Sequence, residues 1–128
     1  MSEIKVDTIS PRTSSTTITL GAAASNLTAL SYSGSDVTID FNNNNNFTLT
    51  LTKATTFKNP SNLTAGQTGS IFLTQDGSGG HTGSWESDWD FIGGAAPTLT
   101  STAAGVDRVD YVILDSSNIQ AVATLNYS

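Results

Sequence analysis

The residues best suited to chemistry form an acidic trio, Glu86, Asp88 and Asp90. In a β-strand these three carboxylates share one face, with neighbours about 6.6 Å apart. That spacing suits a cation site with Asp76 as a further oxygen ligand, or the paired carboxylates of a glycosidase. The spacing requires neither chemistry, and a solvated strand face is the simpler interpretation. We therefore expect no metal site and no cofactor.

Three aromatic residues, Trp85, Trp89 and Phe91, alternate with the acidic trio. Two Trp side chains on one strand face could form a flat platform on which a sugar stacks. Large aromatic side chains at this spacing more often fill a core or a subunit interface. Core or interface aromatics are therefore the prediction, and a glycan-binding platform is the alternative.

His81 is the only histidine, and it lies in the glycine-rich segment 79–83. A general base must be held within hydrogen-bond reach of its nucleophile, and this segment offers little to hold it. The absence of Cys excludes disulfides, a thiolate zinc site and a Cys nucleophile. Residues 77–80 lack the Gly-Lys-Ser/Thr ending of a nucleotide-binding loop. We expect no catalytic residue and no enzyme activity.

The composition indicates a strand-rich protein with a hydroxyl- and amide-covered surface. Thr, Ser and Asn make up 47 of the 128 residues, and charged residues only 12%, against about 25% in typical domains. The net charge of −6 argues against nucleic acid, which needs a basic stripe. No apolar run approaches the roughly 20 residues of a membrane span, so neither nucleic acid nor a membrane is an expected partner.

Alternating apolar and polar side chains mark the elements that must position these groups. The pattern is clearest on either side of the Asn tract 42–46, where it predicts a β-hairpin. Turn signals recur every 8–12 residues or so, and no stretch has helical periodicity. We predict an all-β protein whose residues 17–128 form a single antiparallel β-sandwich or jelly-roll-like domain. The expected strand segments are residues 17–20, 36–41, 47–52, 71–74, 85–91, 106–114 and 119–127.

The first 16 residues are expected to form an extended N-terminal arm. Ile4, Val6 and Ile9 are its large apolar residues after Met1, and Pro11 interrupts the alternation. An arm of about 13 residues can reach roughly 40 Å when stretched. We predict that these three side chains dock on a neighbouring molecule, adding a strand through main-chain hydrogen bonds.

Two parts of the chain resemble phage proteins. Residues 2–13 (SEIKVDTISPRT) resemble the N-terminus of tail-fibre-like virion proteins from marine tailed phages. Several strand and turn signatures and the ending are similar to a β-module of phage fibre and decoration proteins. These signatures are residues 66–69 (GQTG), 74–77 (TQDG), 91–94 (FIGG), 96–100 (APTLT), 106–111 (VDRVDY) and 121–128 (AVATLNYS), with Trp85 between them. The resemblance carries no catalytic residue.

The resemblance implies a structural protein of the virion that assembles as a homotrimer. Because the arm runs almost directly into one domain, we expect a capsid decoration (cement) protein or short head fibre on the capsid exterior. Its expected partners are the phage major capsid protein or other virion proteins. The alternative is a tail-fibre adhesin that binds host surface glycans.

Overall fold

The computed structural model describes residues 26–128. The predicted docking arm, with Ile4, Val6 and Ile9, and the predicted strand at 17–20 lie outside the described residues. Within the described part, no helix is long and apolar enough to cross a membrane.

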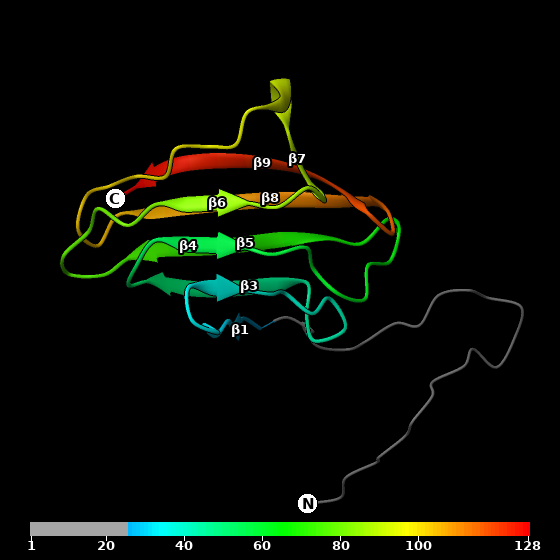
Figure 1. Ribbon diagram of the computed structural model, residues 1–128, viewed down its shortest axis with the longest axis horizontal. Coiled ribbons are helices and arrows are strands. Elements are labelled where there is room, and N and C mark those ends of the chain that lie inside the picture. Colours follow the sequence, from blue (N-terminus) through cyan, green and yellow to red (C-terminus); the bar gives the residue numbers. More distant parts are fainter. Residues whose placement is uncertain (1–25) are drawn as a thin grey trace, which may run out of the picture.

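Nine strands and one short 3₁₀ helix make up the described chain, and they form two sheets that face each other (Figure 1). The larger sheet has the strand order β1-β3-β5-β8-β9-β7, and the smaller has the order β2-β4-β6. The elements are β1 (Thr28–Ala29), β2 (Asp36–Val37), β3 (Asn46–Leu51), β4 (Thr55–Phe57), β5 (Thr68–Gln75), β6 (Gly83–Trp85), β7 (Trp89–Phe91), η1 (Ile92–Gly94), β8 (Val106–Asp115) and β9 (Asn118–Tyr127).

The first six strands form a short solenoid. Successive strands alternate between the two sheets, and each of the first four pairs in parallel with the strand two positions later in the chain. One turn of the solenoid therefore contributes one strand to each sheet. Partners in the larger sheet are 19 residues apart in the first step (Thr28 and Phe47) and 24 apart in the second (Phe47 and Ile71). This unequal spacing explains why the sequence shows no fixed repeat.

A hairpin and one short strand complete the larger sheet. β8 pairs antiparallel with β5 and with β9, and β7 adds in parallel to the free side of β9. In Figure 1 the three-stranded sheet lies in front of the lower part of the larger sheet, and the yellow chain after η1 passes close to β9. The β8–β9 hairpin therefore extends the larger sheet beyond the solenoid.

The core lies between the two sheets and follows the alternation of the strands. Phe47, Leu49 and Leu51 of β3 are at most 3% exposed, while the threonines between them are half-buried or exposed. Thr, Val, Ile and aromatic residues suit such pleated, half-buried positions. The expected all-β, sandwich-like domain is therefore confirmed.

The strand pairing differs from the uniformly antiparallel arrangement that was expected. Only β5–β8 and β8–β9 are antiparallel, and the other five strand pairs are parallel. Alternation of side chains identifies a strand and its buried face, but it is the same for parallel and antiparallel partners. The predicted β8–β9 hairpin does form, with its turn between Asp115 and Asn118.

The hairpin predicted around the Asn tract is wrong. β2 and β3 lie in different sheets, and the segment 42–46 carries the chain from one sheet to the other. Phe41 and Phe47 both point into the core, where their ring centres are 5.9 Å apart in an edge-on contact. Because both apolar faces are buried by facing each other across the core, the two alternating segments need no hydrogen bonds between them.

Candidate binding face

The aromatic residues singled out from the sequence meet in the interior, but they do not come from one strand as predicted. Trp85 ends β6 in the smaller sheet, whereas Trp89 and Phe91 lie on β7 in the larger sheet. A turn at 86–88, in which the Trp89 amide donates to the Glu86 carbonyl (3.1 Å), carries the chain between the sheets. The Trp85 ring centre lies 5.0 Å from that of Trp89 and 5.1 Å from that of Phe91, both edge-on.

This arrangement offers no flat, exposed platform of two Trp rings. Trp89 is 5% exposed, and its indole N–H donates to the Lys58 carbonyl (3.1 Å). Trp85 is partly buried and stacks on Phe57 at 4.0 Å between ring centres, with 14° between the ring planes. One face of the Trp85 ring is thus already covered, and Trp89 is inaccessible.

The acidic trio does not share a strand face either. Glu86 forms an ion pair with Lys58 and accepts a hydrogen bond from the Asn59 amide (2.8 Å). These contacts, led by that with Lys58, lower the pKa of Glu86. Asp88 lies in the turn before β7, and Asp90, on β7, accepts a hydrogen bond from the Asn118 side chain. Among the described residues, no group of three His, Asp or Glu side chains is placed to hold a metal ion.

His81 and Asp76 form a local structural pair. The His81 Nε2 atom lies 2.9 Å from Asp76 Oδ1, which also accepts hydrogen bonds from the amides of Ser78 (2.8 Å) and Gly79 (3.0 Å). The two amides and then His81 lower the pKa of the Asp76 carboxyl. The Asp76 carboxylate therefore stabilises the loop after β5 through these hydrogen bonds.

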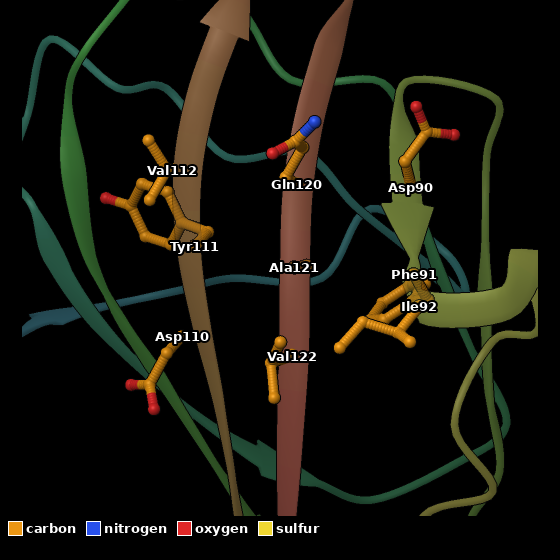
Figure 2. Close-up of a pocket in the computed structure, with 9 residues that line it drawn as sticks. All are labelled: Asp90, Phe91, Ile92, Asp110, Tyr111, Val112, Gln120, Ala121 and Val122. Atoms are coloured by element: carbon orange, nitrogen blue, oxygen red, sulfur yellow. The ribbon is translucent and has the colours of Figure 1, made fainter.

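An open groove lies on the outside of the larger sheet (Figure 2). It has a volume of about 570 Å³, with β9 as its floor and residues of β7, η1 and β8 as its sides. Figure 2 shows Ile92 reaching from η1 toward Val122 on β9. The lining residues are Asp90, Phe91, Ile92, Asp110, Tyr111, Val112, Gln120, Ala121 and Val122.

The two carboxylates that line the groove are already bound within the chain. Asp90 accepts from Asn118, and Asp110 accepts from the Ser70 hydroxyl (2.6 Å) and from Arg108 Nε (3.0 Å). The remaining surface is mostly apolar, since Ile92 is 79% exposed and Val112 and Val122 nearly half exposed. Such a groove is suited to bind another apolar surface.

The sequence reasoning missed Ile92, Val112 and Val122 as binding residues. The signal for Val112 was present, because residues 111–114 form a continuous apolar run. A strand that is apolar on both faces is expected to be covered on both faces. The groove itself could not be foreseen, because it depends on β7 joining the far side of β9.

The two-layered solenoid, extended by the β8–β9 hairpin, defines a strand-built domain with exposed apolar side chains on its larger sheet. The family described as "Putative phage tail fibre C-terminal domain" matches residues 32–118, which is most of the described chain. The chain belongs to this family and is therefore a structural, fibre-type component of a bacteriophage particle. No curated protein and no solved structure matches the chain.

Proposed function

We propose that this chain is a homotrimeric binding part of the virion exterior, carried by a tail fibre, and that it acts without catalysis. The groove on the larger sheet is the observation that carries the proposal. Its carboxylates accept hydrogen bonds from Asn118, Ser70 and Arg108, and its most exposed large side chains are apolar. These features favour adhesion to a protein surface over the turnover of a substrate.

The family match supports a position on the tail. A capsid decoration protein that binds the major capsid protein is the alternative position on the same particle. In either position several linked copies bind the particle together, and each contact raises the effective concentration for the next, so that modest contacts by each copy suffice. Closed symmetry also protects strand edges from uncontrolled pairing.

Localisation on purified virions tests this proposal. Gold-labelled antibodies against the chain, viewed by electron microscopy, are expected to mark the tail fibres. Label on the capsid shell would replace the tail position with the decoration role. Intact particles that carry no label, with the protein left in the lysate, would overturn the proposal.

Host glycans are a second candidate ligand of a tail-fibre domain. Their basis in the sequence was the pair Trp85 and Trp89, which the fold places inside the domain. We therefore expect the intrinsic Trp fluorescence to stay unchanged across a panel of host polysaccharides. A saturable shift with one glycan, abolished by Trp85→Phe, would instead establish an adhesin.

A further inference from the structure

We propose that the outer face of the six-stranded sheet is the surface through which copies of this chain pack against one another. By outer face we mean the side chains of that sheet that point away from the core, together with Ile92. This inference rests on the proposed function, because it names the surface that forms the proposed trimer. The partner that covers this face is a further copy of the same chain.

The exposed apolar side chains are distributed very unevenly between the two sheets. All seven large apolar side chains that are strongly exposed among the described residues lie on, or next to, strands of the larger sheet. The smaller sheet instead points Asp36, Thr56 and Ser84 outward, in one row across its three strands. The large exposed apolar side chains are therefore concentrated at the larger sheet, and all but Leu125, which alternates with the core-facing Ile119 and Ala121, lie on its outer face or beside it. The seven residues are Leu27, Ile92, Val112, Leu114, Val122, Leu125 and Tyr127.

Apolar hollows occur at both ends of this outer face. The groove over β9 lies toward the β7 edge, and a second, shallower hollow lies toward the β1 edge. Leu27 and Phe72 line the second hollow, together with Asn26 and Asn46. Contact with a flat partner would therefore bury apolar groups across the whole width of the sheet.

The area of the face is sufficient for a stable contact. Four strands of 6–10 residues and two edge strands of 2 and 3 residues, about 4.8 Å apart, present roughly 600 Å² per copy. Two such faces in full contact would bury about 1,200 Å², and three faces that meet around a three-fold axis bury about 1,800 Å² in total, which is the scale of specific interfaces. Contact through the groove alone would bury far less area, so the whole outer face is needed for a stable contact.

Two of the charges on the face, Arg108 and Asp110, are paired within each copy, while Asp90 at the β7 edge is hydrogen-bonded by the neutral Asn118 side chain. Arg108 Nε lies 3.0 Å from the Asp110 carboxylate, and the Arg108 guanidinium lies 5.3 Å from the centre of the Tyr127 ring. A second copy can therefore cover this region without burying an unpaired charge, which would be costly. Mixed polar and apolar faces with few unpaired charges are suited to self-association.

The mass of the full chain in solution tests the inference. By light scattering we expect the wild type to have three times the mass of the 13.3 kDa chain. The double variant Val112→Asp, Val122→Asp is expected to be a folded monomer, because every copy would bring two unpaired carboxylates into the contact. The matched control Thr38→Asp adds a charge to an exposed position on the side of the smaller sheet and is expected to remain a trimer.

The outcomes separate this inference from the proposed function. A monomeric wild type would overturn the trimer itself. A trimeric wild type whose Val112→Asp, Val122→Asp variant is still a trimer would overturn only the assignment of the face. Should that variant fail to fold, Val112→Thr, Val122→Thr keeps strand-forming side chains of nearly the same size. We then expect trimer formation to need roughly 100-fold more protein, and an unchanged concentration dependence would overturn the assignment.

Discussion

At the scale of single residues, Asp107 shows how a buried carboxylate can hold the loop before β8 to the end of β9. It is 2% exposed and accepts hydrogen bonds from the Thr100 amide (2.7 Å), the Thr100 hydroxyl (2.6 Å) and the Asn126 amide (2.9 Å). We expect Asp107→Ala to leave these donors unpaired and to lower the free energy of unfolding by about 2–4 kcal/mol. Urea denaturation measures this change, and the exposed Asp115→Ala serves as the control. If Asp107→Ala and Asp115→Ala lower the free energy of unfolding by the same amount, Asp107 does not have this structural role.

Gly69 is the residue at which the backbone has no room for a side chain. A Cβ atom there would lie 1.8 Å from the Asn45 carbonyl oxygen and 2.8 Å from the Tyr111 hydroxyl. The same carbonyl accepts the Tyr111 hydroxyl hydrogen bond at 2.6 Å. We expect Gly69→Ala to force the two strands apart and to cost at least about 2 kcal/mol of stability. Gly77→Ala, where a Cβ meets nothing within 4 Å, should be nearly neutral in the same urea titration. A tolerated Gly69→Ala would mean that this close approach does not exist.

At the scale of elements, the alternation of strands between two sheets can be tested with engineered disulfides. Thr50 and Thr74 are partners on the parallel strands β3 and β5, and neighbouring strands hold Cα atoms within the range that a disulfide spans. Because the chain has no other Cys, Thr50→Cys, Thr74→Cys is expected to oxidise to a single intramolecular bond. Free-thiol titration after oxidation, and peptide mapping, measure it.

The control for this experiment is the pair that the sequence-predicted hairpin would have brought together. Thr38→Cys, Thr50→Cys should stay reduced within the chain, because Thr38 is exposed on the side of the smaller sheet and Thr50 on the outer face of the larger. If this control variant forms a disulfide rapidly and Thr50→Cys, Thr74→Cys forms none, the two segments on either side of residues 42–46 pair as a hairpin, and the alternation between sheets is wrong.

The strands could be predicted from sequence because alternation and turn residues are local properties. β3, β5, β8 and β9 follow expected segments closely, and the β8–β9 hairpin has its expected turn. Their partners could not be predicted, because parallel pairing depends on residues 19 or more positions apart. The same limit applied to the site. The sequence predicts Trp85 and Trp89 on one strand, because no local signal distinguishes the turn at 86–88 from a continuing strand.

At the scale of the whole molecule, stability in alkali reflects one buried phenol and one ion pair. Burial raises the pKa of Tyr111, and the Glu86 contact raises the pKa of Lys58. A raised pKa in the folded state means that stability is fully present below the ordinary value and is lost as the pH rises through the folded one. Urea midpoints should therefore decline above about pH 10. In Tyr111→Phe, whose ring cannot ionise, the urea midpoint should decline less steeply with pH. An equally steep decline would show that ionisation of Tyr111 does not cause the loss of stability.

Stability in acid depends on carboxylates in three separate turns. Hydrogen bonds from Asn62 and the Asn42 amide lower the pKa of Asp40, the loop amides lower that of Asp76, and Lys58 lowers that of Glu86. A lowered pKa in the folded state stabilises the fold above the ordinary pKa values of 3.8 and 4.5, and this stabilisation is lost as the pH falls through the folded pKa values. The urea midpoint should therefore be level near neutrality and fall below about pH 4.5.

Asp76→Asn keeps an oxygen for the Ser78 and Gly79 amides but cannot ionise. The difference in free energy of unfolding between wild type and variant should therefore shrink as the solution becomes more acidic. A difference that stays constant down to the most acidic point measured would show that the Asp76 charge does not contribute to the stability of the fold.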